Sequence, residues 1–255
     1  MIDRMKLTLL GTGTYCSANR GAAANYLEIG GLKVLADFGS GGLRQLARAK
    51  VNYDDIDMAF FSHIHTDHIL DLAALLQASY WTPGVRRTKP LTLVGPAGFK
   101  NYFESYIRPI SELPRPEAFT FAIKVIEIEQ PLTYPGFTVD FVHTRHDPEN
   151  ASVAYKFTEG AVSLVISGDC LYDQKLIDLC ADSDLLLLEC SCADGVPSTR
   201  HLHASECGEI ARQAHAKQLI LTHLHPTSSE RLRLSQARKI FPNTRLASEL
   251  MQIDL

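Results

Sequence analysis

The chain has 255 residues, of which 45% are hydrophobic and 21% are charged, and its formal net charge at pH 7 is -4. These values are ordinary for a globular protein, and the slightly acidic balance argues against a broadly basic surface that coats nucleic acid. A core of this size needs no disulfide bonds, so the six cysteines are most simply free thiols.

The first half of the chain is predicted to mix strands with helices. Gly30-Gly31, between two apolar runs, is a strong signal for a β-hairpin. Apolar residues recur at helical spacing after Thr66, which indicates a helix there. The elements expected in this half are strands at 6–10, 25–29, 32–36, 58–61 and 91–94, and helices at 43–50, after 66, and from 95 to about 106.

Strands return in the second half, beginning between 119 and 142 with Tyr134-Pro135-Gly136 as a turn. Two runs of strands indicate two similar halves, with strands inside and helices outside. We therefore expect one domain, 1–255, of the α/β class, built as a four-layer αββα sandwich with its functional loops at one edge. Later elements are expected as strands at 151–155, 161–166, 184–188, 219–222, 245–247 and 251–253, and as helices at 205–215 and 229–240.

The N-terminal apolar run is too short for a signal peptide, and no segment approaches the roughly 20 apolar residues of a membrane span. We therefore expect a cytoplasmic protein without a membrane partner.

Four potential metal ligands occur within six residues, as His63, His65, Asp67 and His68 in an H-x-H-x-D-H pattern. The apolar strand before them would place His63 and His65 on the same side, where they could share one metal ion. Asp67 and His68 lie where the strand gives way to a helix and could face a second ion. The alternative is that all four are satisfied by backbone partners. Without a cation, however, three imidazoles and a carboxylate so close together would repel one another or stay unsatisfied.

On this motif, and on Leu10-Gly11-Thr12-Gly13-Thr14 near the start, the sequence resembles the metallo-β-lactamase superfamily. Within that superfamily it is most similar to the ribonuclease Z and phosphodiesterase branch. The resemblance runs nearly end to end and implies the αββα fold, two divalent metal ions and hydrolase activity. Mixed nitrogen and oxygen ligands favour zinc, and ligand type leaves manganese and iron open. Dimers are common in this branch, which leaves a homodimer open.

The same resemblance implies the remaining metal ligands. His146 matches the third ligand position of the family, with His143 as an alternative nearer the strand body. Asp169 matches the bridging aspartate, whose two oxygens can bind two ions at once. His223 ends a buried strand and matches the final ligand, with His225 as the alternative. One ion would be held by His63, His65, His146 and Asp169, and the other by Asp67, His68, Asp169 and His223.

Residues beyond the ligands are implied to support the site. Asp37 would accept the second N–H of a ligand histidine and so orient the imidazole, unless it caps the helix that begins near Gly41. Glu189 would pair with a later histidine, for which His203 is the candidate, to give a general acid or an oxyanion stabiliser. The alternative is that His203 or Ser205 only caps the helix at 205–215.

Together these residues predict a dinuclear phosphodiesterase. A metal-bridging hydroxide, oriented by Asp67, would attack a small or short phosphodiester, including short nucleotide substrates, and His203 held by Glu189 would assist the leaving oxygen. Only 23 positions separate His146 from Asp169, too few for the protruding arm that grips tRNA in ribonuclease Z. Intact precursor tRNA is therefore not the expected substrate.

Two other functions remain open from the sequence. The protein could be a lactone or thioester hydrolase similar to lactonases or glyoxalase II, which use a similar ligand set. It could instead be a non-catalytic metal-binding module that binds nucleic acid. Cys170 stands where the branch usually has threonine, and Cys190 and Cys192 are the only cysteines close enough in sequence to raise the question of metal or redox chemistry.

Overall fold

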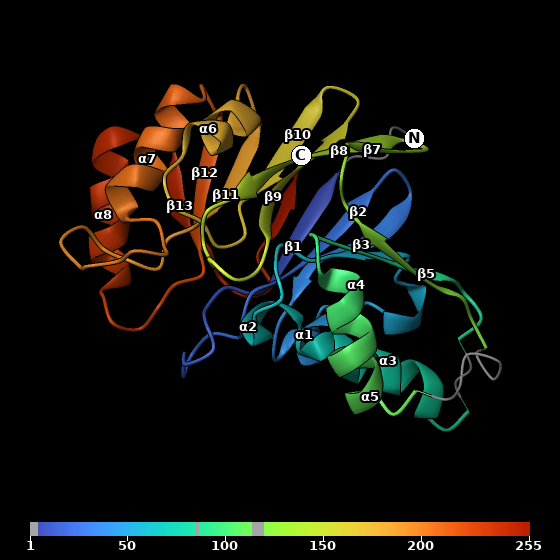
Figure 1. Cartoon of the computed structure of the whole chain (residues 1–255). Coiled ribbons are helices and arrows are strands. Elements are labelled where there is room, and N and C mark those ends of the chain that lie inside the picture. The colour runs from blue at the N-terminus through green and yellow to red at the C-terminus, as the bar shows by residue number, and fades with distance from the viewer. Residues whose placement is uncertain (1–4, 85–86, 114–119) are drawn as a thin grey trace.

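The computed structural model of the protein describes residues 5–84, 87–113 and 120–255. Two seven-stranded sheets pack face to face, and helices cover the outer face of each (Figure 1). This is the four-layer αββα sandwich that the sequence predicts. The first sheet has the strand order β14-β1-β2-β3-β4-β5-β6, and the second has the order β13-β12-β11-β10-β9-β8-β7.

The strands of the first sheet are β1 (Lys6–Gly11), β2 (Ala24–Ile29), β3 (Leu32–Phe38), β4 (Met58–Phe60), β5 (Leu91–Gly95), β6 (Ile123–Glu127) and β14 (Gln252–Asp254). Those of the second sheet are β7 (Leu132–Tyr134), β8 (Phe137–Thr144), β9 (Ser152–Glu159), β10 (Val162–Ile166), β11 (Leu185–Glu189), β12 (Gln218–Thr222) and β13 (Thr244–Leu246). The predicted hairpin at Gly30-Gly31 joins β2 to β3.

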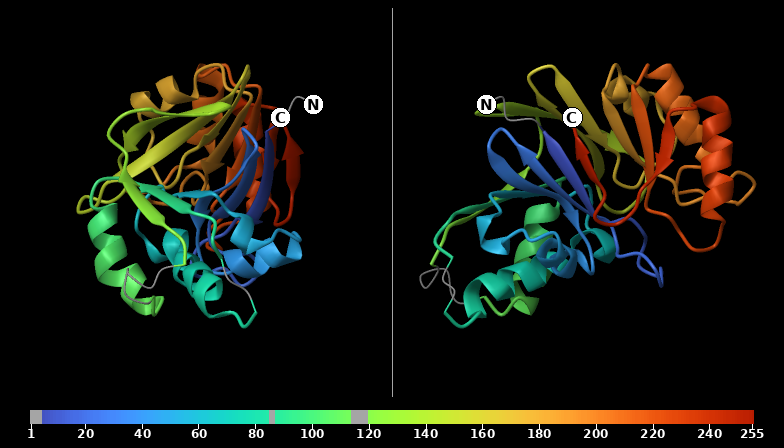
Figure 2. Two further views of the ribbon diagram at one scale, coloured as in Figure 1. Left: turned by 90° about the vertical axis from the view of Figure 1, so that its right-hand side faces the viewer. Right: turned by 180° about the vertical axis from the view of Figure 1, so that it is seen from behind.

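Helices from each half of the chain cover the sheet of their own half (Figure 2). The first sheet is covered by α1 (Gly42–Arg48), α3 (Asp71–Trp81), α4 (Phe99–Tyr102) and α5 (Arg108–Ile110), and the second by α6 (Gln174–Cys180), α7 (Ala204–Gln213) and α8 (Glu230–Ile240). No helix within the described ranges is both long and apolar enough to cross a membrane.

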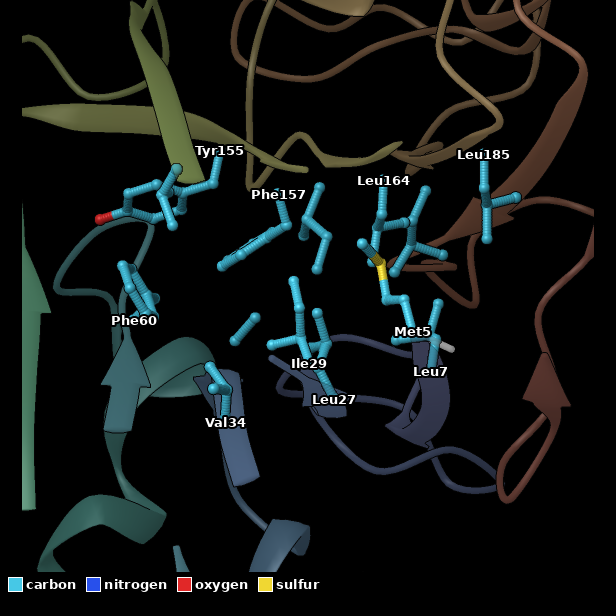
Figure 3. Packing of buried hydrophobic residues seen from close by; sticks show 14 of the residues in the cluster. Met5, Leu7, Leu27, Ile29, Val34, Phe60, Tyr155, Phe157, Leu164 and Leu185 are labelled. Atoms are coloured by element: carbon cyan, nitrogen blue, oxygen red, sulfur yellow. The ribbon is translucent and has the colours of Figure 1, made fainter. Parts of the chain in front are cut away.

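The main hydrophobic core lies between the two sheets (Figure 3). Phe60 of β4 packs edge-on against Tyr155 and Phe157 of β9, with ring centroids 5.4 and 5.2 Å apart. Leu187, in the interior strand β11, is fully buried in the same cluster. Burying one such side chain contributes about 1.5–3 kcal/mol, so the interface between the sheets holds the two halves together firmly.

Parallel strands bring the functional loops to one edge. In the first sheet β3 runs parallel to β4, and Ala36 lies opposite Phe60. In the second sheet β10, β11 and β12 are parallel, and Glu189 lies opposite Thr222. Because parallel strands end at the same edge of a sheet, the residues that follow β3, β4, β10, β11 and β12 gather there.

Two sequence predictions needed correction. The helix expected from Gly95 begins only at Phe99, because Gly98 adopts a φ of 88°, and it continues through a π-helical stretch, Phe103–Ile107. The strands expected between 119 and 142 do not form one group. β6 completes the first sheet and β7 begins the second, while residue 119 itself lies outside the described ranges.

Candidate metal centre

The H-x-H-x-D-H segment lies where β4 ends and the short helix α2 (Thr66–Ile69) begins. His63 and His65 follow β4, and Asp67 and His68 belong to α2, so the predicted change from strand to helix is confirmed. The end of β3 approaches this helix closely. A Cβ atom added at Gly39 would lie 1.9 Å from the carbonyl oxygen of Asp67, so only glycine fits there.

A first group of possible ligand atoms comes from both halves of the chain. His65 Nδ1 lies 3.1 Å from His63 Nε2 and 3.1 Å from His146 Nε2. Asp169 Oδ2 lies 3.8 Å from His63 Nε2 and 3.6 Å from His146 Nε2. The outward nitrogen of His146, Nδ1, lies 2.9 Å from the carbonyl oxygen of Arg200, which leaves Nε2 directed into the group.

A second group lies on the other side of Asp169. His223 Nε2 is 3.2 Å from His68 Nε2 and 3.3 Å from Asp67 Oδ2. Asp169 Oδ1 is 3.3 Å from His68 Nε2 and 3.4 Å from His223 Nε2. The two oxygens of one buried carboxylate therefore face two different groups of ligand atoms.

These residues fit a pair of divalent cations. Nitrogen ligands about 2.0–2.1 Å from a tetrahedral zinc ion lie about 3.3–3.4 Å from one another, close to the separations in both groups. Asp169 Oδ1 is buried and accepts no well-aligned hydrogen bond within the described part of the chain. Buried polar atoms normally have a partner, and a bound cation would supply one. Mixed imidazole and carboxylate donors suit zinc.

The electrostatics of the cluster favour an ionised Asp169 and a neutral His63, the states that metal binding requires, but a protonated His68. Burial would disfavour the charged form of Asp169, but the neighbouring His223, His68 and His63 hold its pKa well below the usual range. Burial lowers the pKa of His63 far below its ordinary value, and His68 adds to this. For His68, the carboxylates of Asp169 and Asp37 outweigh burial and raise the pKa, so a cation bound at Nε2 would displace a proton.

Asp37 supports the metal loop from the first sheet without facing either group. Its Oδ2 lies 2.8 Å from His68 Nδ1 and accepts a hydrogen bond from Ser62 Oγ at 2.8 Å. Ser62 Oγ in turn lies 3.0 Å from His63 Nδ1. Helix α1 is capped by Gly41 without a side-chain hydrogen bond, so the alternative role of Asp37 as a helix cap is wrong.

Glu189 plays a similar part at the end of β11. Its Oε1 accepts from the backbone N–H of Leu202 at 3.1 Å and lies 3.0 Å from His201 Nδ1. Burial works against protonation of His201, but the hydrogen bond and charge of Glu189, with Asp169, raise its pKa to about 9. The Oε2 of Glu189 accepts from both the backbone N–H and the hydroxyl of Ser191, each at 2.9 Å.

The predicted pairing of Glu189 with His203 is therefore wrong. His203 is the N-cap residue of α7, where its backbone N–H donates to Glu206 Oε2 at 2.8 Å. Its ring is held by the carbonyl oxygen of Val196, 2.7 Å from Nε2, and by Glu206, 3.0 Å from Nδ1. These contacts fix His203 at the start of the helix. They match the alternative left open by the sequence, in which His203 caps the helix.

For the other two pairs of candidate histidines, His143 or His146 and His223 or His225, the structure places the preferred member of each pair in the cluster. His143 is exposed and lies against Phe141, away from the cluster, whereas His146 is buried within it. His223 faces the second group, while His225 is at the rim, with Nδ1 2.8 Å from Thr227 Oγ1. The six cysteines, all within the described ranges, are free thiols, as expected.

The cluster opens into a cavity of about 490 Å³. His201 lines it beside the ligand residues, and Tyr15, Val196 and Pro197 supply less polar walls. The cavity is therefore a site in which a small molecule can reach both groups of ligand atoms.

Sequence reasoning missed His201, Ser62 and Ser191. His201 and His203 flank one leucine, and only the helix start at Ala204 shows which of them is committed to capping. Ser62 directly precedes His63 at the end of a predicted strand, a position that could have been recognised. Ser191 carried no sequence signal, because its role depends on the contact between the ends of β11 and β12.

Comparisons with known proteins agree with this fold. The family model described as Anti-Pycsar protein Apyc1 matches residues 5–241. A ribonuclease Z of Archaeoglobus fulgidus is 24% identical over 307 aligned positions that cover 98% of this chain and 97% of the relative. The probable metallo-hydrolase YhfI of Bacillus subtilis is 29% identical over 230 positions, or 86% of this chain and 87% of the relative. The crystal structure of YhfI superposes with a TM-score of 0.85 at 27% identity, and the match covers 99% of this chain and 100% of the YhfI chain. The crystal structure of human tRNase Z, short form, superposes with a TM-score of 0.78 at 23% identity, and the match covers 97% of this chain and 98% of that chain.

Proposed function

Because the chain belongs to the family of the anti-Pycsar protein Apyc1, in the ribonuclease Z-like branch of the metallo-β-lactamase superfamily, we propose that this metallo-hydrolase is a phosphodiesterase for small or short phosphodiesters. One observation carries the proposal. The two oxygens of Asp169 face two separate groups of ligand atoms, one made of imidazoles and the other of imidazoles and the Asp67 carboxylate.

Each of the two groups of ligand atoms would hold one divalent cation. When bound, the cations supply Lewis acidity toward phosphoryl oxygens and lower the pKa of a water molecule. Zinc fits the donor atoms, and manganese and iron are compatible with them. The carboxylates among the ligands leave the occupied site with a net positive charge, which attracts a phosphodiester anion. One cation would be held by His63, His65, His146 and Asp169, and the other by Asp67, His68 and His223 with the second oxygen of Asp169.

Residues of the chain itself would then position the reactants and move the proton. His201, held through Nδ1 by Glu189, lines the cavity and can donate from Nε2 to the leaving-group oxygen. Its contact with Glu189, rather than any contact of His203, supports this assignment. Asp67 also lines the cavity, and its carboxylate would accept a hydrogen bond from the attacking water and so orient it.

The preference for small substrates has two supports. β9 and β10 are joined by a short turn at 160–161, so no protruding arm lies between His146 and Asp169. The cavity of about 490 Å³ is of the size that holds a small ligand. A short nucleotide or a small metabolite diester fits these dimensions better than a folded RNA.

The test is a substrate panel on protein loaded with zinc or with manganese. It contains bis(p-nitrophenyl) phosphate, cyclic nucleotides, a short oligoribonucleotide, precursor tRNA, a lactone and a glutathione thioester. Asp169→Asn is the inactive reference, and His143→Ala, which changes an exposed histidine outside the site, is the matched control. We expect the wild-type protein and the control to hydrolyse small diesters, and Asp169→Asn to be inactive.

The competing functions have distinct signatures in this panel. Turnover of the lactone or thioester with inert diesters would contradict the proposal in favour of the other hydrolase class. Efficient and specific cleavage of precursor tRNA would overturn the size argument. Fully metallated protein that binds RNA without hydrolysing any member of the panel would indicate a binding module instead.

A further inference from the structure

Ser191 is a buried residue that connects Glu189 with His223. It stands two residues after Glu189, beyond the end of β11, and is 3% exposed. Its hydroxyl lies 2.9 Å from Glu189 Oε2 and 2.9 Å from His223 Nδ1. The hydroxyl therefore lies between the carboxylate that holds His201 and an imidazole of the second ligand group.

The acceptors around the hydroxyl favour one direction for these hydrogen bonds. The hydroxyl has one proton to donate, and the oxygens near it are Glu189 Oε2 and the carbonyl oxygen of His223, at 3.2 Å. Both oxygens only accept, and the Glu189 carboxylate is the stronger acceptor; when the hydroxyl donates to either oxygen, Ser191 Oγ accepts from His223 Nδ1–H. This places the ring proton on Nδ1 and leaves the lone pair of Nε2 directed toward Asp67 and His68.

The first sheet contains an independent counterpart of this arrangement. Ser62 donates its backbone N–H and its hydroxyl to Asp37, at 2.7 and 2.8 Å, and its Oγ lies 3.0 Å from His63 Nδ1. Asp37 also contacts a further histidine directly, His68, as Glu189 contacts His201. Each half thus has one carboxylate, one serine and two imidazoles in the same order of contacts.

Arg233, in helix α8, holds the backbone around Ser191 in place. The fully buried Arg233 donates from Nη2 to the carbonyl oxygen of Ser191 at 2.8 Å and also to that of His225. One guanidinium therefore joins the loop after β11 to the loop after β12. His223 lies in the second loop with a φ of 53°, a left-handed conformation that persists only where neighbouring contacts enforce it.

We propose that Ser191 is the positioning residue that selects the Nδ1–H form of His223 and so presents Nε2 to the second cation. Ser62 performs the same task for His63 and the first cation. The proposal rests on the metal centre of the proposed function and adds to it a division of labour. Ser62 Oγ lies closer to His63 Nδ1, at 3.0 Å, than to His68 Nδ1, at 3.5 Å, so each serine chiefly governs the affinity of one of the two cations.

The experiment measures cation binding and the ring proton directly, without relying on turnover. Ser191→Ala and Ser62→Ala are compared with Ser183→Ala as the control. Ser183 lies near the opposite end of β11, and its buried hydroxyl makes only a long hydrogen bond, of 3.5 Å, to the carbonyl oxygen of Ala181. Zinc binding is titrated against a competing chelator. Long-range proton–nitrogen NMR spectra of the metal-free proteins report which nitrogen of His223 carries the proton.

In Ser191→Ala we expect one of the two equivalents of zinc to bind about 10–100-fold more weakly while the other is unchanged. Ser62→Ala should weaken the other equivalent instead, and Ser183→Ala neither. His223 should lose its Nδ1–H form only in Ser191→Ala. Ser191→Thr, which restores the hydroxyl, should recover both readouts. If Ser191→Ala does not fold, Ser191→Cys, which keeps the size but donates and accepts weakly, takes its place.

Three results would overturn the proposal. Wild-type affinity for both equivalents together with an unchanged Nδ1–H form in Ser191→Ala would remove the role of Ser191 and leave the metal centre standing. Wild-type protein that binds fewer than two equivalents would overturn both this inference and the proposed function. Equal weakening of both equivalents in each serine variant would contradict the division of labour.

Discussion

Replacing His201 and His203 in turn, each by alanine, separates a proton donor from a helix cap. His201→Ala removes the imidazole that Glu189 holds at 3.0 Å beside the ligand residues. General acids contribute about 10²–10⁴-fold to rate, so kcat should fall by that factor, which corresponds to about 2.7–5.5 kcal/mol of transition-state stabilisation. Because Glu189 and His201 are not assigned as ligands, the bound metal should stay at two per chain.

His203→Ala should behave in the opposite way. It removes the ring contacts to Val196 and Glu206 at the start of α7 while leaving the Glu189–His201 pair intact. Loss of a cap costs about 1 kcal/mol, which lowers Tm by about 2–4 °C in a domain of this size. Its kcat should stay close to that of the wild-type protein.

The assay combines steady-state hydrolysis of bis(p-nitrophenyl) phosphate, thermal denaturation and metal analysis of the same preparations. Glu189→Gln, which keeps the shape of the side chain but weakens its hold on His201, should show a smaller loss of kcat than His201→Ala. The reasoning fails if His203→Ala lowers kcat more than His201→Ala does, or if His201→Ala loses one metal ion, because His201 would then be a ligand.

Three further changes test the site and the core. Asp169→Asn should lose tight binding of both cations, since each oxygen faces one group, and retention of two tightly bound ions by metal analysis would contradict the bridging assignment. Gly168→Ala should be destabilised by about 1–3 kcal/mol in urea unfolding, because Gly168 has a φ of 56° and the new Cβ would lie 2.4 Å from that of Ser62; an unchanged midpoint would refute this. Leu187→Ala should cost about 2–5 kcal/mol in the same assay without changing metal content, and a loss below about 1 kcal/mol would mean that the sheets repack.

The sequence was sufficient for the layers and for most strands because their apolar patterns are strong. The four consecutive leucines of β11 are fully buried, and the Gly30-Gly31 turn joins β2 and β3 as predicted. The pairing of strands was harder to predict, since β6 resembles the strands that follow it along the chain, β7 and β8, yet belongs to the first sheet and they belong to the second. A hydrophobic pattern shows which face of a strand is buried but not which strand lies beside it.

At the site, the predicted ligands lie together, whereas the supporting contacts were only partly foreseen. Histidines and aspartates at strand ends are readable because parallel strands bring those ends to one edge. The choice between His201 and His203 depended on a single turn of backbone before α7, and a local pattern does not determine where such a ring points. Asp37 was placed correctly because it ends a strand next to the motif.

The seam between the two sheets passes through the middle of the cluster. The first half of the chain contributes the residues of the H-x-H-x-D-H segment, whereas His146, Asp169 and His223 come from the second. An N-terminal half that had emerged alone from the ribosome would contain four of these side chains but not the carboxylate that faces both groups. The proposed second cation would therefore lack a complete ligand set until β12 has been synthesised, because His223 directly follows that strand.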